Sequence, residues 1–384
     1  MTRNWARNRA CERIEAIGAE PLDAMNLRLR VLDVLRGMVG FDAHVWLLTD
    51  PVTTVGAAPL AAVPCLPELP ALIKAKYATP VNRWTVLQRQ ASPAGRLHHA
   101  AGGDLARSRV WREVMSRYGI GDVASAVFAD QFGCWGFLDL WRNASRQPFN
   151  AADAEFIASV AVPLTTALRQ CQARTFAGPA APRPPGLGPV VLTLDDNLRI
   201  TSRTAASQDW LDVLLPPEPD ERAVPASVYN VAAQLLAAEA GVDDHPASTR
   251  VHLADGLWLT LRAARLALDE AGPGPAPGPG PAPGPGPAPG QRSRDAATIV
   301  VTIEEASAAE RLELFARACG LTVREQELLC LLATGSDTRA MARQMSLSEH
   351  TVQDHLKSIF AKTGARDRVT VLSHALGTRT PTSG

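Results

Sequence analysis

A polar triplet, Gln353, Asp354 and Lys357, lies at helical spacing in the stretch SLSEHTVQDHLKSIF, residues 346–360. Such side chains can hydrogen-bond base edges in the major groove of DNA: glutamine pairs with adenine, aspartate accepts from cytosine N4, and lysine donates to guanine. The opposite side of the same repeat is apolar and carries Val352, Leu356 and Ile359. A polar helix face is more often simply solvated, so the triplet alone does not establish nucleic-acid binding.

The sequence around the triplet, residues 321–377, predicts four short helices. The first begins with a capping box, in which the side chains of Thr322 and Glu325 accept from each other's backbone amides, and Gly335 can end it. Residue types that cap helix N-termini precede the other three helices: Asp337, Ser348 and Asp367. A tight Met-Ser-Leu turn separates the second helix from the third, so the pair has the form of a helix-turn-helix.

This run closely resembles the LuxR/NarL-type DNA-binding domain of bacterial transcription regulators. The matching segments are LTVREQELL, GSDTRAMARQMSLSEHTVQDHLKSIFAKTG and ARDRVTVLSHAL. Two positions depart from the family pattern: Ser336 stands where an apolar residue is usual, and Thr363 where leucine is common. The resemblance implies an all-α four-helix domain that binds double-stranded DNA as a homodimer, on two half-sites about one helical turn apart.

The resemblance also implies roles for individual residues. Gln353, Asp354 and Lys357 match positions that face base edges. The implied contacts to the DNA backbone are Thr338, Arg339, Ser348, Thr351, Lys362 and Arg366. Glu325 matches an acidic residue that helps to hold the four helices together, while Val352, Leu356 and Ile359 seat the recognition helix. The last helix matches a dimer-forming helix and carries Val369, Leu372 and Leu376.

Basic charge in this region is modest but concentrated. The whole chain has 39 basic and 39 acidic residues, a balance that argues against a protein that coats nucleic acid or membrane indiscriminately. Between residues 338 and 368, however, six Lys and Arg residues stand against three Asp and Glu residues. Asp354 repels phosphate, so its expected benefit is selectivity and not affinity.

The alternative within binding proteins is a sigma-factor-like promoter reader, which also uses a helix-turn-helix.

Residues 21–176 predict an α+β domain. An amphipathic helix is expected over residues 23–39, then the strand AHVWLLTD, then the hairpin DVASAVFADQFGCWGFLDLWR with its turn near residues 130–133. The expected buried face of that helix carries Met25, Leu29, Leu32, Leu35 and Met38. Asn150 can cap a later helix that runs to about residue 174, and Pro163 should break or kink it. This order of elements resembles a GAF domain.

Residues 189–306 resemble a PAS domain. Two strands flank a turn at residues 195–197, helical stretches follow near 205–215 and 227–240, and STRVHLADGLWLTLRAARL predicts a hairpin. A Pro/Gly repeat at residues 271–291 interrupts this region. The segments on either side of it, GLWLTLRAARL and ATIVVTIEEA, are both strand-like. We therefore expect an exposed insertion loop between two paired strands and not a domain boundary.

The expected organisation is multidomain, with α+β sensor domains ahead of an all-α domain. A polar lead at residues 1–20 precedes the GAF-like domain at 21–176, a Pro/Gly-rich linker at 177–188, the PAS-like domain at 189–306, a connecting helix at 307–318 and the helix-turn-helix domain at 319–384. The expected function is that of a cytoplasmic, sequence-specific transcriptional regulator modulated by its sensor domains. Its expected partners are DNA and a second copy of the chain, with RNA polymerase as a further candidate.

Enzymatic chemistry is not expected. The six cysteines are scattered without a C-x-x-C pair, and His44, His98 and His99 are isolated from other metal-ligand types. Neither a phosphate-binding P-loop nor a nucleophile paired with a base is recognisable, so an enzyme in the GAF-like or PAS-like region is the remote alternative. No cofactor, metal or membrane span is expected, although the sensor domains have room for an unidentified small ligand. Trp135, Phe137 and Trp141 alternate along one strand and should pack a sheet face or line such a pocket.

Overall fold

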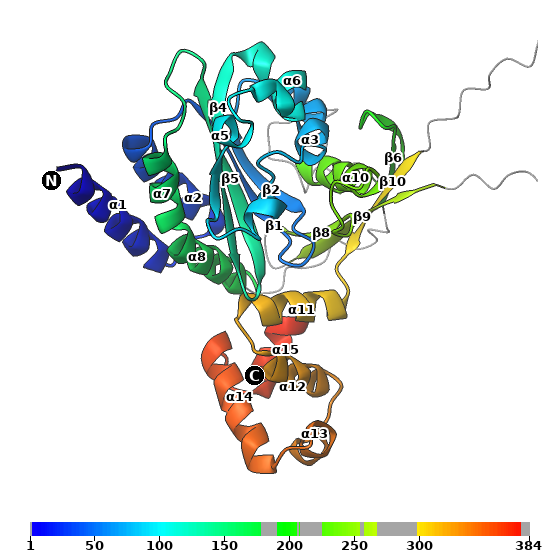
Figure 1. Cartoon of the computed structure of the whole chain (residues 1–384). Helices are drawn as coiled ribbons and strands as arrows, with labels where there is room; N and C mark the ends of the chain where they lie inside the picture. Colours follow the sequence, from blue (N-terminus) through cyan, green and yellow to red (C-terminus); the bar gives the residue numbers. More distant parts are fainter. Residues whose placement is uncertain are drawn as a thin grey trace, which may run out of the picture.

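Two antiparallel sheets of the same topology lie side by side, and a helical domain is attached to them through helix α11 (Figure 1). The computed structural model describes residues 2–177, 190–205, 207, 225–253, 257–266 and 298–377. The first sheet has the strand order β2-β1-β5-β4-β3 and the second has the order β7-β6-β10-β9-β8. Counted within each sheet, both orders run second, first, fifth, fourth, third. The chain therefore contains two α+β units with one arrangement of strands.

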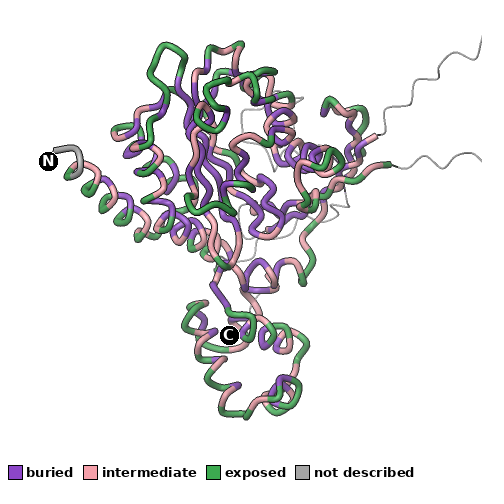
Figure 2. Tube along the Cα trace, viewed as in Figure 1, coloured by how far each residue is buried: buried purple, intermediate pink, exposed green. Residues whose placement is uncertain are grey.

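The first unit has helices on both faces of its sheet. Its strands are β1 (Ala43–Thr49), β2 (Gly56–Ala62), β3 (Ala94–Arg96), β4 (Ile120–Asp130) and β5 (Gly133–Asn143). On one side lie α1 (Thr2–Ala19), α2 (Ala24–Met38), α7 (Ala151–Ser159) and α8 (Ala161–Arg174). On the other lie α3 (Leu69–Tyr77), α4 (Trp84–Leu87), α5 (Leu97–Ala100) and α6 (Arg109–Glu113), with 3-10 turns at Leu66–Glu68, Leu105–Arg107 and Met115–Tyr118. Figure 2 shows that the strands between these layers are the most buried part.

Most predicted elements of the first unit are confirmed, but the buried face of α2 differs from the prediction and the predicted polar lead is a helix. Helix α2 begins after its cap Asp23, yet Met25 and Leu29 are exposed, because the stripe through Leu27 and Val31 faces the sheet instead. The segment predicted as a polar lead forms α1, an 18-residue helix. The sequence pattern did not predict this helix because few of its residues are apolar and buried. The strands β4 and β5 form the predicted hairpin, and they shift register next to Trp135.

The predicted helix break near Pro163 is confirmed. Asn150 caps α7 with a full capping box, and α7 and α8 meet at an angle of 42°. Pro163 lies in the first turn of α8, where its missing N–H costs nothing, whereas a continuous helix would clash with the ring. Among the described residues no single helix is long and apolar enough to cross a membrane; the bent pair α7–α8 meets that test by length and composition only.

The second unit contains the strand pairing that the sequence predicted across the Pro/Gly repeat. Its elements are β6 (Val190–Leu194), β7 (Ile200–Arg203), α10 (Ala226–Glu239), β8 (Ser248–His252), β9 (Trp258–Arg265) and β10 (Ile299–Glu305). Strands β9 and β10 pair antiparallel from Ile299 with Arg265 to Glu305 with Leu259. The repeat itself, all but the first residue of the predicted linker at 177–188 and nearly all of the predicted helix at 205–215 lie outside the described residues.

The two units share a core and two buried ion pairs. Apolar residues of the first sheet, such as Leu47 and Phe137, belong to one buried cluster with Leu192, Val231 and Ile303 of the second unit. Two salt bridges cross the same interface: Arg83 to Asp243 at 2.9 Å and Arg250 to Asp50 at 2.6 Å. All four side chains are at least nine-tenths buried. This interface is continuous with the core of each unit and is not a loose contact between separate domains.

The carboxy-terminal helices continue from this interface. Helix α11 (Ala308–Ala318) has a capping box of Ser307 and Glu310, and it is followed by α12 (Val323–Ala333), α13 (Thr338–Met345), α14 (Glu349–Thr363) and α15 (Arg368–Leu376). Arg317 donates to the carbonyl of Phe132 at 3.0 Å, and Arg169 donates to the carbonyl of Ala318 at 3.3 Å. Helix α11 is therefore fixed to the turn between β4 and β5 and to α8.

Deleting residues 273–289 should leave a folded protein, because β9 and β10 already pair across the Pro/Gly repeat. Halving the length of a surface loop changes its closure free energy by only about 0.6 kcal/mol. The deletion variant should therefore unfold cooperatively, with a Tm close to that of the parent in a calorimetric scan. Loss of a cooperative transition for the second unit would contradict the interpretation of the repeat as an insertion loop.

Removing Arg250 should be far more costly than removing an exposed arginine. Arg250→Met leaves the Asp50 carboxylate buried without its partner and should lower the free energy of unfolding by about 3–5 kcal/mol. The double variant Asp50→Asn/Arg250→Met should be less destabilised than the sum of the two single variants. Arg109→Ala, which breaks an exposed pair with Glu113, should cost less than about 0.5 kcal/mol in the same urea titration. Equal losses for Arg250→Met and Arg109→Ala would show that the buried pair contributes nothing special.

Candidate nucleic-acid interface

Helices α13 and α14 form a helix-turn-helix at the end of the molecule farthest from the sheets (Figure 1). Ser346 takes the left-handed conformation between them, with φ of 54°, and the amide of Leu347 donates back to the carbonyl of Ala342 at 2.9 Å. This closed turn sets the angle between the two helices. Met341 of α13 packs on the apolar face of α14 that the sequence predicted: Val352, Leu356 and Ile359 are all buried.

The predicted base-facing triplet lies together on the exposed side of α14. Gln353, Asp354 and Lys357 are all exposed, and Lys357 Nζ donates to Asp354 Oδ1 at 3.1 Å. His350 Nε2 lies 3.5 Å from the other carboxylate oxygen of Asp354. The hydrogen bond from Lys357, aided by the nearby histidine charges, holds the pKa of Asp354 below its ordinary value. In the free protein the ionised Asp354 side chain therefore already has a cationic partner, Lys357, on the same helix.

The predicted DNA-backbone residues divide into free and committed side chains. Arg339 and Arg366 are exposed and form no ion pair with any described residue. Thr338 Oγ1 accepts from Arg368 at 2.7 Å and lies 3.5 Å from the Gln353 amide nitrogen. Ser348, Thr351 and Lys362 also take part in contacts within the domain. Ser348 caps α14 by accepting from the Thr351 amide at 3.1 Å, and Lys362 is paired with Glu325.

Glu325 joins α12 to α14. Its carboxylate is 3% exposed and accepts from Ser358 Oγ and Lys362 Nζ, each at 2.6 Å, as well as from the backbone amide of Thr322 at 2.7 Å. Burial opposes its ionisation, but these hydrogen bonds outweigh burial and lower the pKa of Glu325 to about 2. The charge is thus part of the helix packing, and Lys362 supplies the opposite charge from the recognition helix.

The predicted dimer helix, α15, is partly used within the chain. Val371 and Ala375 are buried, and Arg311 of α11 donates to the carbonyl of His374 at 3.3 Å. Val369 is 58% exposed, while Leu372 and Leu376 are half-buried against the core. Of the three residues implied in dimer contacts, only Val369 is clearly exposed, because α11 and the domain core already cover part of this helix.

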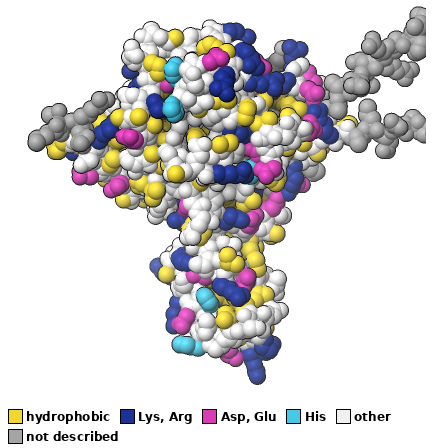
Figure 3. Space-filling view, in the orientation of Figure 1, with side chains coloured by type: hydrophobic (Ala, Val, Ile, Leu, Met, Phe, Trp, Pro, Cys, Tyr) yellow, Lys and Arg dark blue, Asp and Glu magenta, His cyan; other side chains and the backbone are white. Residues whose placement is uncertain are grey.

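Three charged residues of the helical domain were not singled out from the sequence. Arg343 of α13 is exposed, Arg368 supports Thr338, and His350 lies one turn before Asp354. The i, i+4 spacing of His350 and Asp354 is the signal that could have identified that pair. Figure 3 shows Lys and Arg side chains spread over this end of the molecule, with acidic side chains between them. The arrangement suits a few specific contacts better than a uniformly basic surface.

A second candidate site is an apolar cavity of about 60 Å³ on the α3 face of the first sheet. Phe137 and Trp141 line it, as the sequence allowed, together with the ion pair of Lys76 and Asp139 at 2.6 Å. Trp135 does not, because the register shift beside it turns its ring toward the helices on the opposite face, where it is buried. Asn230 of α10 lies at the same cavity, so both units contribute to its wall.

One acidic cluster in the second unit resembles a metal site in composition. Ligand atoms of Asp243, Asp244 and His245 all lie within 4.8 Å of one another. Both oxygens of Asp243 are already engaged, because one accepts from Arg83 and Thr85 and the other accepts from the amide of His245. This carboxylate serves the interface between the units and is not available to a metal ion.

Comparison with known proteins supports the helical domain. Residues 320–375 match the family model described as bacterial regulatory proteins, luxR family. The monoamine regulon transcriptional regulator of Klebsiella aerogenes is 38% identical over 53 residues, which is 14% of this chain and 23% of that protein. The match thus spans about a quarter of the relative's length. Residues 320–375 therefore form a LuxR-family helix-turn-helix domain.

Replacing Glu325 with glutamine should loosen α12 from α14. Its carboxylate stabilises the folded domain above about pH 4.5, and that contribution is lost as the pH falls toward the folded-state pKa of about 2. Glu325→Gln should cost about 1–3 kcal/mol at neutral pH and weaken this acid dependence. Hydrogen–deuterium exchange of peptides from residues 321–377 measures both effects.

Glu327→Gln is the matched control, because Glu327 is on the same helix but forms an exposed pair with Arg324. It should leave the exchange rates of the domain nearly unchanged. If the two glutamine variants lose protection equally, Glu325 has no special part in the packing.

Proposed function

We propose that this chain is a sequence-specific DNA-binding transcription regulator whose two α+β units modulate binding. The observation that carries the proposal is the exposed polar face of α14, in a segment that matches the LuxR-family domain. No catalytic role is proposed. Because its partner is DNA, the protein is proposed to act in the cytoplasm.

Helix α14 would enter the major groove and read base edges with three side chains. Gln353 can pair with adenine, while Lys357 can donate to guanine and Asp354 can accept from cytosine N4. Lys357 and Asp354 already contact each other at 3.1 Å, so a G·C pair can satisfy both when their mutual hydrogen bond opens. A phosphate can satisfy only the lysine, and this difference favours bases over backbone.

The affinity that does not depend on sequence would come from few contacts. Arg339 and Arg366 are exposed, and the hydroxyl groups of Thr338, Ser348 and Thr351 lie near the N-terminal ends of α13 and α14. Each phosphate that the protein neutralises makes the slope of log binding constant against log salt concentration steeper by about 0.9. With so few free basic side chains, one copy of the chain should bind DNA weakly. A homodimer on two half-sites is therefore the proposed functional form.

Modulation by the two units is proposed to act through α11. The GAF-like and PAS-like resemblances of the first and second units are consistent with their shared strand order, and the cavity near Phe137 is a candidate sensor pocket. Helix α11 contacts the first unit through Arg317 and the second through Glu313, so a shift between the units moves the helix that leads into the DNA-binding domain. A signal would then act by changing the population of arrangements that present two recognition helices together.

Asp354→Ala should tighten binding to random DNA and narrow the gap between the true site and random DNA. The side chain repels phosphate, and its removal also frees Lys357 for backbone contacts. Fluorescence anisotropy with a duplex selected from a random-sequence pool, and with a scrambled duplex of the same length, measures the two affinities. Equal shifts on both duplexes would mean that Asp354 does not read a base.

Lys357→Ala and Arg109→Ala provide the comparison in the same assay. Lys357→Ala should cost about 1–3 kcal/mol of discrimination, because it loses a base contact. Arg109→Ala removes the same charge from the surface of α6, far from α14, and should leave discrimination unchanged. A failure of the parent protein to prefer any duplex would overturn the proposed function itself.

A further inference from the structure

Arg28 of helix α2 is a buried cation without a carboxylate partner. Its side chain is folded inward, the residue is 4% exposed, and its guanidinium donates to three carbonyls: Ala24 and Trp46 at 2.9 Å and Ala58 at 3.0 Å. Within the described residues no Asp or Glu oxygen lies within 4.0 Å of it. By contrast, the buried Arg83, Arg142 and Arg250 pair with Asp243, Asp153 and Asp50 respectively.

This unpaired charge carries a cost that carbonyl oxygens offset only in part. Burial disfavours the charged guanidinium and lowers the pKa of Arg28 to about 10, so it remains charged at neutral pH. Buried charges in proteins are ordinarily paired with an opposite charge. The terminal nitrogen Nη2 makes no hydrogen bond with the described residues and is not sealed from solvent. Nη2 is therefore the guanidinium nitrogen that remains available to an anion.

Arg28 is in the wall of an open groove of about 540 Å³ between the two units. The groove runs between the start of α2, the end of α8, the strands β1 and β2, and the strands β8 and β9. Its apolar wall includes Leu22, Met25, Leu48, Leu168 and Trp258. Its size falls in the range of small-molecule sites, which are common at interfaces between domains.

The charges around the groove favour an anion. Arg28 and Arg174 contribute guanidinium groups, the Arg250 guanidinium is already paired with Asp50 and Glu313, and Asp23 is the one carboxylate among the described lining residues. Asp23 is already occupied as the cap of α2, since it accepts from the amides of Met25 and Asn26. The Asp23 charge acts on Arg28 from a distance but forms no ion pair with it, so a carboxylate in the groove would be the direct partner that Arg28 lacks.

We propose that this groove binds a small amphiphilic anion, with its carboxylate on Arg28 and its apolar body against the wall that includes Leu168 and Trp258. The site is distinct from the cavity beside Phe137, which is on the opposite face of the first sheet. It supplies the opposite charge that Arg28 lacks. Met25, which is 57% exposed, contributes its apolar side chain to the wall of the groove.

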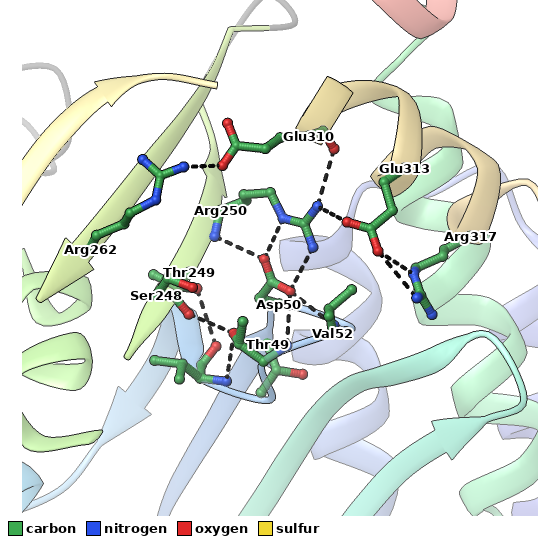
Figure 4. A network of polar contacts seen from close by, with 12 residues as sticks. Thr49, Asp50, Val52, Ser248, Thr249, Arg250, Arg262, Glu310, Glu313 and Arg317 are labelled. Carbon is green, nitrogen blue, oxygen red and sulfur yellow. Dashed lines mark hydrogen bonds and ion pairs between the residues drawn. The ribbon is translucent and has the colours of Figure 1, made fainter. Parts of the chain in front are cut away.

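Arg250 connects this groove to the helical domain. It lines the groove and also holds Asp50 and Glu313 in the polar network shown in Figure 4. A ligand there would therefore lie next to the contact that positions α11. This regulatory consequence rests on the proposed function, whereas the binding site itself does not.

Calorimetric titration of the full chain with sodium octanoate tests the site, with octan-1-ol as the neutral analogue of the same length. Octanoate should bind with one saturable site, and octan-1-ol should bind at least tenfold more weakly. Arg28→Met should weaken octanoate binding at least tenfold, because the ion pair is lost. Absence of saturable octanoate binding at millimolar concentration, or equal affinity for the alcohol, would overturn the proposal.

Two exposed substitutions on α2 make the test independent of whether Arg28→Met folds. Met25→Glu places an acid in the groove wall and should weaken octanoate binding at least tenfold. Leu29→Glu makes a similar change one turn along the same helix, where the side chain is 42% exposed and does not line the groove, and should leave binding unchanged. Equal octanoate affinity in both variants would exclude the groove as the site. Loss of octanoate binding in these variants should not change DNA binding by α14. The groove proposal and the proposed function can therefore fail separately.

Discussion

The buried ion pair between Asp50 and Arg250 is the contact on which the rest of the arrangement depends. Asp50 directly follows the first strand of one unit, and Arg250 lies on an edge strand of the other. Both side chains are almost fully buried, so removing either one leaves the other charge buried and unpaired, at a cost of several kcal/mol. Because Arg250 also donates to the carbonyl of Glu310 and to the carboxylate of Glu313, the same guanidinium fixes the start of α11. One residue thereby connects two sheets and the helix that follows them.

The position of the DNA-binding domain follows from how α11 ends. Gly320 has φ of +66°, and Arg169 and Phe132 pack where a side chain would otherwise begin, at 2.8 and 3.5 Å. The chain can therefore turn sharply out of α11 while remaining in contact with the first unit. Helix α12 starts beyond this turn, which leaves α13 and α14 directed away from the sheets (Figure 1). The polar face of α14 is consequently exposed without any rearrangement of the units.

What the sequence could predict was local, and what it could not was a matter of long-range pairing. Caps such as Asp23, Asn150 and Ser348 lie within three residues of the amides they satisfy, so their helices could be located. The strands around the Pro/Gly repeat were recognisable because alternation survives an insertion. The buried face of α2 and the register shift at Trp135 depend on contacts with distant strands. Arg28 and Arg250 read as ordinary surface arginines in the sequence, and only the fold makes them buried charges.

The acid in the recognition helix has a physical reason once its neighbours are known. In the free protein Asp354 shares its charge with Lys357 and His350 on an exposed surface, where such pairs contribute little to stability and open easily. Opening this pair therefore costs little free energy when the protein binds DNA. A base pair that offers an acceptor to Lys357 and a donor to Asp354 replaces both contacts at once, whereas the DNA backbone offers acceptors only. Under the proposed function, selectivity would arise because the wrong partner leaves the Asp354 carboxylate without a donor.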